Sequence, residues 1–144
     1  MNDCRVMKIL IDTNVILDAL MNRTPWAVDA QNILLAVAQD EAEGCITASA
    51  FTDIYYLMKK HLKNKTQTKT ALLNLLSVIE ILEVTSKDCV EAFKLPMQDY
   101  EDALLAYCAH RHAVDNIITR NKKDYKNSPV KAISPNDLLK KIRS

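Results

Sequence analysis

Four aspartates occupy positions at which their carboxylates could bind a metal ion. They are Asp12, Asp53, Asp99 and Asp102. Like charges gathered in one cleft raise each other's pKa, so clustered carboxylates usually share a cation. Mg²⁺ and Mn²⁺ take oxygen ligands, often only one or two carboxylates together with waters. Such ions lower the pKa of a bound water and can hold the attacking and leaving oxygens of a phosphodiester in line. The aspartates therefore predict phosphodiester hydrolysis that needs neither a histidine nor a serine.

Each acid also has a purely structural explanation. Asp12 could cap the helix expected after it, and Asp99 could cap its own helix, with Asp102 in an imperfect capping box. Asp53 is expected in the first or second turn of a helix, where the helix dipole favours acids. Asp124 could be an ordinary loop acid. The shared location of the acids, and not any one of them, favours a metal site over separate caps.

The elements that must position these residues alternate between short apolar strands and amphipathic helices. Strands are predicted at residues 8–11, 45–49, 79–84, 116–119 and 130–133. Helices are predicted at residues 13–22, 26–41, 49–62, 66–79, 86–95, 99–113 and 134–143. This alternation predicts a single α/β domain over residues 1–144, with three layers and a central parallel sheet flanked by helices. Functional groups of such sheets gather beyond the carboxyl ends of the strands.

Local signals set the expected ends of several helices. Thr24 and Pro25 suit the cap and the first turn of the second helix. Gly44, the only glycine of the chain, lies where that helix should end. Ser86 is the expected cap of the fifth helix, and Pro96 should stop it.

The composition indicates an ordinary globular protein. Of the 144 residues, 49% are hydrophobic and 26% charged, and no apolar run is long enough to span a membrane. The segment MNDCRVMK has an acid where a secretory leader would be basic, so we expect no leader. The four cysteines, which predict reduced and mostly buried thiols, are far apart at Cys4, Cys45, Cys89 and Cys108. We therefore expect a cytoplasmic protein.

Charge is unevenly distributed along the chain. Residues 1–58 hold eight acidic and three basic side chains, whereas residues 110–144 hold three acidic and nine basic ones. If these parts meet, an acidic patch lies beside a basic one, as binding a polyanion near a metal cluster requires. A solvated basic face at the end of the chain explains the same numbers.

Other chemistries find less support in the sequence. No G-x-S-x-G, P-loop or G-x-G-x-x-G motif occurs, and His110 and His112 point to different faces of a helix. A phosphatase that used Asp12 as its nucleophile would need an acid two residues later, where the chain has Asn14. A receiver domain would need an acid at the end of a central strand, which the strand ending at Ser49 lacks.

Four segments resemble the PIN domain family, the metal-dependent ribonuclease fold of the VapC-type toxins of bacterial toxin–antitoxin pairs. They are ILIDTNVILDAL, ITASAFTDIYYL, DYEDALLAYCA and IITRNKKDY, in the order and spacing of the family over nearly the whole chain. The resemblance implies a PIN-like fold and an endoribonuclease that uses Mg²⁺ or Mn²⁺. It also implies a homodimer and an antitoxin protein that covers the site.

The resemblance assigns the acids of the family to particular residues. The first acid falls on Asp12, with Asn14 supporting it. The third falls on Asp102, with Asp99 one turn before it. The second, usually a glutamate, is Asp53, whose shorter side chain can reach the metal through a water. Asp12 and Asp102 are thus the main expected metal ligands, and Asp53 and Asp99 complete the site.

The fourth acid of the family, two residues after Thr119, is replaced by the amide Asn121. The resemblance gives Asn121 the task of orienting a metal-bound water or a substrate phosphate. Arg120, Lys122 and Lys123 would hold the RNA backbone. The departures at the second and fourth acids motivate an alternative, namely a catalytically weak PIN-like domain that acts as an RNA- or protein-binding regulatory module.

Overall fold

A computed structural model describes residues 5–143 of the chain. The strands are β1 (Lys8–Ile11), β2 (Glu43–Thr47), β3 (Glu80–Leu82), β4 (Asn116–Ile118) and β5 (Ala132–Ile133). The α-helices are α1 (Thr13–Leu20), α2 (Ala27–Ala38), α3 (Ala48–Leu62), α4 (Lys65–Leu76), α5 (Ser86–Ala92), α6 (Tyr100–Arg111) and α7 (Pro135–Arg143). A short 3-10 helix, η1, covers Lys122–Tyr125.

The strands form one sheet in the order β3-β2-β1-β4-β5, and every neighbouring pair is parallel. The central strand is β1, in which Leu10 is in register with Cys45 of β2 and with Ile117 of β4. These three side chains are almost fully buried, as expected for a parallel sheet covered on both faces. The predicted α/β fold class, a parallel sheet flanked by helices, is confirmed.

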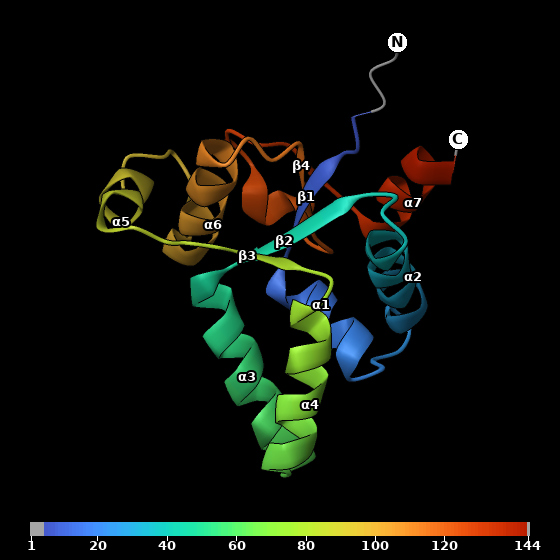
Figure 1. The fold of residues 1–144 in the computed structure, drawn as a ribbon. Coiled ribbons are helices and arrows are strands. Elements are labelled where there is room, and N and C mark those ends of the chain that lie inside the picture. The colour runs from blue at the N-terminus through green and yellow to red at the C-terminus, as the bar shows by residue number, and fades with distance from the viewer. Residues whose placement is uncertain (1–4, 144) are drawn as a thin grey trace.

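Alternate residues of the strands face two separate helical layers. Ile9, Ile11 and Ile118 pack with residues of α1, α2, α3, α4 and α7. Leu10 and Ile117 point the opposite way and pack with α6 and η1. This alternation follows from the period of two residues along a strand. Figure 1 shows the result, with α5 and α6 on one side of the molecule and α2 and α7 on the other.

Helices α3 and α4 pack against each other and project away from the sheet (Figure 1). The side chain of Thr47 caps α3 by accepting a hydrogen bond from the backbone N–H of Ala50. At the other end, Lys63 takes a left-handed conformation, with φ of 53°, and Asn64 caps α4 by accepting from the N–H of Gln67. The chain thus reverses within two residues, which leaves one long side of α3 open to solvent.

The prediction that Gly44 ends the second helix is wrong. α2 ends at Ala38, and Gly44 lies inside β2. A Cβ atom at Gly44 would lie 3.0 Å from Cγ2 and 3.1 Å from Cγ1 of Val37. Glycine is therefore needed here for the close approach of α2 to the sheet, and not for a turn.

The beginning of α2 also differs from the prediction. The helix begins at Ala27, so Pro25 does not lie in its first turn and Thr24 does not cap it. Trp26 stands at the cap position and makes no side-chain cap hydrogen bond. Tertiary contacts of this loop, described below for Trp26, override the local signal.

The prediction that Ser86 caps the fifth helix is wrong. The cap is Thr85. The Thr85 hydroxyl accepts from the N–H of Asp88, while the Asp88 carboxylate accepts from the N–H of Thr85. This reciprocal pair requires the hydroxyl to stand three residues before the acid, which only Thr85 does. α5 ends at Ala92, before Pro96 is reached.

Three sequence expectations concern the chain as a whole. No helix among residues 5–143 is both long and apolar enough to cross a lipid bilayer. Cys45 and Cys108 are buried free thiols, as expected, whereas the free thiol of Cys89 is exposed. Cys4, like the ends of the domain predicted over residues 1–144, lies outside the described residues.

Candidate metal centre

The order of the sheet creates a crevice between β1 and β4. From β1 the chain adds strands first on one side of the sheet and later on the other, so this crevice is the topological switch point. Asp12 follows β1, and Thr119 follows β4. The Thr119 hydroxyl donates a hydrogen bond to Oδ2 of Asp12, at 2.9 Å. The same hydroxyl accepts from the N–H of Asn121, at 3.1 Å.

Asp12 is therefore not a helix cap in the usual sense. It occupies the cap position of α1, but its side chain makes no cap hydrogen bond. Its backbone N–H is bound to the carbonyl of Ile118, at 2.9 Å, which ties the end of β1 to β4. Burial raises the pKa of the Asp12 carboxyl, and the hydrogen bond from Thr119 only partly opposes this. A nearby cation would stabilise the charged form of a carboxyl group held in this way.

Residues from four parts of the chain line one open pocket of about 540 Å³, called here the acidic pocket. The predicted site residues among them are Asp12, Asn14, Asp53, Asp102 and Asn121. Asp124 and Glu101 add two further carboxylates to the lining. The structure thus brings together four of the five predicted catalytic residues, the exception being Asp99.

Asp99 and Asp102 take different roles at the start of α6. Oδ1 of Asp99 accepts a hydrogen bond from the backbone N–H of Asp102, at 2.9 Å, so Asp99 caps the helix. Its side chain lines a second pocket of about 350 Å³, called here the lysine pocket because Lys123 and Lys126 line it. The two pockets share Asp102 and Asp124 and meet there.

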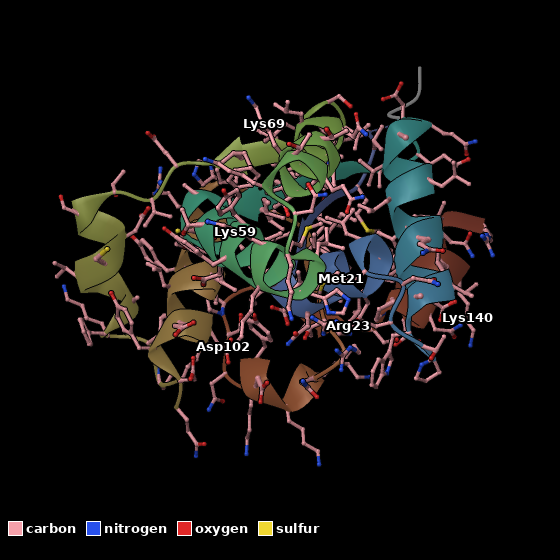
Figure 2. The ribbon with its side chains drawn as sticks, turned by 90° about the horizontal axis from the view of Figure 1, so that it is seen from below. Met21, Arg23, Lys59, Lys69, Asp102 and Lys140 are labelled. Atoms are coloured by element: carbon pink, nitrogen blue, oxygen red, sulfur yellow. The ribbon has the colours of Figure 1, made fainter. Side chains whose placement is uncertain are left out.

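Asp102 is the most perturbed carboxyl of the site. Burial, followed by repulsion from Asp99, Asp12 and Asp124, raises the pKa of Asp102 to about 7. Figure 2, which shows the molecule of Figure 1 from below, labels Asp102 on α6. A carboxyl that is half protonated near neutral pH marks a place where negative charge lacks compensation. Sites of this kind are frequently functional.

Tyr125 contributes a buried hydroxyl beside the carboxyl group of Asp102. Its ring packs against the core, and its hydroxyl makes no hydrogen bond of ordinary length within residues 5–143. Burial and the neighbouring carboxylates of Asp12 and Asp102 raise the pKa of this hydroxyl above its ordinary value. A buried hydroxyl beside acids is satisfied most simply by an ordered water.

These observations fit a hard divalent cation with few direct protein ligands. Within the described part of the chain, no three carboxylate, histidine or cysteine side chains converge closely enough to enclose an ion by themselves. Mg²⁺ usually keeps several waters and binds through one or two carboxylates, so convergence of three is not required. Asp12 and Asp102 are the partly buried pair best suited to this role, and the buried Tyr125 hydroxyl beside them suits a site that holds waters.

The predicted RNA-binding cations lie in three different environments. Nε and Nη2 of Arg120 donate to the two carboxylate oxygens of buried Asp18, at 2.7 and 3.1 Å. The guanidinium carbon lies 3.9 Å from the centre of the Trp26 ring. Arg120 is therefore engaged within the protein, and its contact with RNA stays a prediction. Lys123 lines the lysine pocket, and exposed Lys122 makes only a long ion pair of 3.8 Å with Asp137.

Sequence reasoning missed two parts of this site. Glu101 follows Asp99 by two residues and therefore shows no helical spacing that would connect it with the cluster. The pairing of Asp18 with Arg120 joins residues 102 positions apart. Its only sequence signal was an aspartate among the apolar residues of the first helix. A charge in such a run needs a partner, and that signal could have been followed.

The fold agrees with the comparison against protein families. The model of the PIN domain matches residues 8–123, which include every residue of the acidic pocket named above except Asp124. The chain belongs to the PIN domain family. The resemblance seen in the sequence is thereby confirmed. No curated protein matches the chain.

Solved structures of similar fold include several from toxin–antitoxin systems. VapBC2 from Rickettsia felis, bound to promoter DNA, is 22% identical with a TM-score of 0.68, covering 89% of this chain and 98% of that one. A toxin–antitoxin complex from Klebsiella pneumoniae is 23% identical with a TM-score of 0.64, covering 88% and 97%. VapC20 from Mycobacterium tuberculosis, a toxin that cleaves the sarcin-ricin loop, is 13% identical with a TM-score of 0.61, covering 76% and 86%. At these identities the likeness concerns the fold.

Proposed function

We propose that this protein is a metal-dependent endoribonuclease and the toxin of a toxin–antitoxin pair. The observation that carries the proposal is the uncompensated acidic pocket at the switch point of a PIN domain. Three structural neighbours are toxins or toxin complexes, and one of them is a toxin that cleaves the sarcin-ricin loop, which supports RNA as the substrate class here. RNA as the proposed substrate supports a cytoplasmic location as part of the same proposal.

In this proposal Asp12 and Asp102 hold Mg²⁺ or Mn²⁺. Asp53 and Asp99 complete the site through waters, because Asp53 is exposed and Asp99 is engaged as a cap. When bound, the ion supplies charge that stabilises the phosphodiester being cleaved and lowers the pKa of the attacking water. Thr119 fixes the orientation of the Asp12 carboxylate by its hydrogen bond, as a supporting residue does in metal sites.

Asn121 and its neighbours serve the substrate and not the proton transfer. An amide can donate to a phosphate or orient a water, but it cannot accept a proton at neutral pH. Asn14, which also lines the acidic pocket, can contact the substrate in the same way. Lys122 and Lys123 are exposed next to Asn121 and provide positive charge for the RNA backbone.

The proposed partners are an antitoxin protein that covers the acidic pocket and a second copy of this chain. The complexes from Rickettsia felis and Klebsiella pneumoniae contain toxin and antitoxin together, which supports the first of these. The homodimer rests on the family resemblance. Sedimentation of the purified protein, with and without the candidate antitoxin, tests both.

The nuclease proposal is tested with the Asp12→Asn variant. Purified protein is incubated with RNA at millimolar Mn²⁺ or Mg²⁺, and cleavage is followed on a gel. We expect wild type to cut and Asp12→Asn to lose cleavage while keeping its fold. Asp29→Asn is a matched control, because Asp29 lies on α2, far from the acidic pocket, and this variant should cut like wild type.

A second experiment separates the nuclease from the binding-module alternative. The alternative is motivated by the short acid at Asp53 and the amide at Asn121. Restoring the family pattern with Asp53→Glu and Asn121→Asp should increase cleavage and tighten metal binding. If wild type at high Mn²⁺ and the restored variant both leave RNA intact, the nuclease proposal fails and the binding-module reading replaces it.

A further inference from the structure

One face of α3 carries a stripe of exposed side chains that leads away from the acidic pocket. Asp53, Tyr56, Leu57 and Lys60 stand at positions i, i+3, i+4 and i+7, which share a helix face. All four are exposed. The stripe runs from a carboxylate, through an aromatic and an aliphatic side chain, to a cation.

Tyr56 is unusual because it is a large aromatic side chain with 67% of its surface exposed, next to a cluster of acids. It lines the acidic pocket together with Asp12 and Asp102. Its ring meets that of Tyr55 edge-on, with centroids 5.5 Å apart and an interplanar angle of 81°. Tyr55 is partly buried against the core, so this contact steadies the Tyr56 ring. A steadied, exposed aromatic ring is a surface on which a nucleobase can stack.

Positive charge lies on both sides of the acids. On one side Lys123 and Lys126 line the lysine pocket, which adjoins the acidic pocket at Asp102 and Asp124. On the other side Lys60 lies one turn beyond Tyr56 on α3 and makes no ion pair within residues 5–143. A chain of phosphates could therefore find cations before and after the carboxylates.

We infer that Tyr56 is the stacking platform for a nucleobase of single-stranded RNA, next to the phosphate that lies at the acidic pocket, and that Lys60 binds the phosphate beyond that base. The inference rests on the proposed function and deepens it by assigning two side chains that would bind the substrate. In a duplex the bases stack on each other, so Tyr56 can receive a base only from a loop or an unpaired strand.

Stacking is tested with short RNA strands that carry 2-aminopurine, whose fluorescence is quenched by stacking, at one position at a time. The strands are titrated with the full-length protein in CaCl₂, which screens the carboxylates. Wild type should quench one position strongly, and Tyr56→Phe should quench it equally. Tyr56→Ala should lose the quenching and bind the strand roughly 5- to 150-fold more weakly.

The control is Phe93→Ala, because Phe93 is 75% exposed, stacks on Tyr100 with centroids 4.2 Å apart, and lines neither the acidic pocket nor the lysine pocket. It should leave quenching and affinity unchanged. Thermal unfolding shows that each variant is folded. If wild type cleaves RNA but Tyr56→Ala quenches and binds as wild type does, the inference is wrong while the nuclease proposal stands. Loss of self-association in Tyr56→Ala, with RNA binding unaltered, would assign Tyr56 to a protein interface and also overturn it.

The phosphate contact is tested by the salt dependence of binding. Removing one phosphate contact from a single-stranded site lowers the log–log salt slope by about 0.7. Lys60→Ala should show this change, whereas Lys69→Ala should not. Figure 2 labels Lys69 on α4, well away from Asp102. Equal slopes for wild type and Lys60→Ala would remove Lys60 from the substrate path.

Discussion

The raised pKa of Asp102 predicts that this residue destabilises the metal-free protein at neutral and higher pH. Its pKa changes from an ordinary value of 3.8 to about 7 on folding. Between about pH 4 and pH 7 the folded protein therefore keeps a proton that the unfolded chain has released. The folded state binds more protons in this range, so the free energy of unfolding falls as the pH rises through it. The variant Asp102→Asn lacks the titrating carboxyl, so its free energy of unfolding should not fall in this way as the pH rises.

The size of the effect follows from the shift. A change of about 3 pKa units corresponds to about 4 kcal/mol at most. Because the acidic pocket is open, solvent screens part of the repulsion, and about 1–2 kcal/mol is the reasonable expectation. Asp102 also lies in the first turn of α6, where the helix dipole favours a negative charge by about 0.3–1 kcal/mol. The neighbouring variant Glu101→Gln measures that opposing contribution, because Glu101 is exposed in the same turn.

Urea denaturation in EDTA at pH 4 and pH 8 measures the difference. Asp102→Asn should match wild type at pH 4 and exceed it by about 1–2 kcal/mol at pH 8. Added Mn²⁺ should then stabilise wild type and have little effect on the variant. The reasoning is refuted if Asp102→Asn and Glu101→Gln change stability equally at both pH values.

Two further predictions concern the scaffold. Nε of Arg111 lies 2.7 Å from the fully buried carboxylate of Asp88. The variant Arg111→Met leaves this carboxylate without its cation, so the free energy of unfolding measured in urea should fall by about 3 kcal/mol. Since the pKa of Asp88 is lowered to about 2, wild type should lose this stabilisation as the pH falls from about 4 towards 2, and the variant should show a flatter acid limb. Gly44→Ala should cost about 1–3 kcal/mol because its Cβ would press against Val37, and the double variant with Val37→Ala should recover most of it; an unchanged midpoint for Gly44→Ala alone would show that α2 can move.

Sequence reasoning was accurate where one signal extended over many residues. The apolar strands and the helical spacing of the long helices predicted the sheet and its layers. It failed where a local signal competed with a tertiary contact. Glycine is typical of helix ends, but Gly44 is required inside the strand because a Cβ atom there would press against the side chain of Val37. Pro25 suits a helical turn, but the adjacent Trp26 lies over Arg120, which lies 94 positions further along the chain.

The candidate site could be predicted as a set of residue types but not as a geometry. Parallel strands bring their carboxyl ends to one edge, which predicted that Asp12, Asp53 and Asp102 would meet. The sequence could not show that the side chain of Asp99 would be used as a cap, because a cap and a ligand require the same residue at the same spacing. Nor could it show that Arg120 would bind Asp18, since the partners of a long side chain depend on the finished fold.

The hydrogen bond between Thr119 and Asp12 joins residues 107 positions apart in the chain. During synthesis, β1 emerges early and must wait for β4, its neighbour in the sheet, while more than a hundred residues are added. Until then Asp12 has neither Thr119 to orient it nor Asn121 beside it. A nascent chain on the ribosome therefore carries no assembled acidic pocket. The acidic pocket, and any activity that depends on it, can form only after Thr119 and Asn121 have emerged.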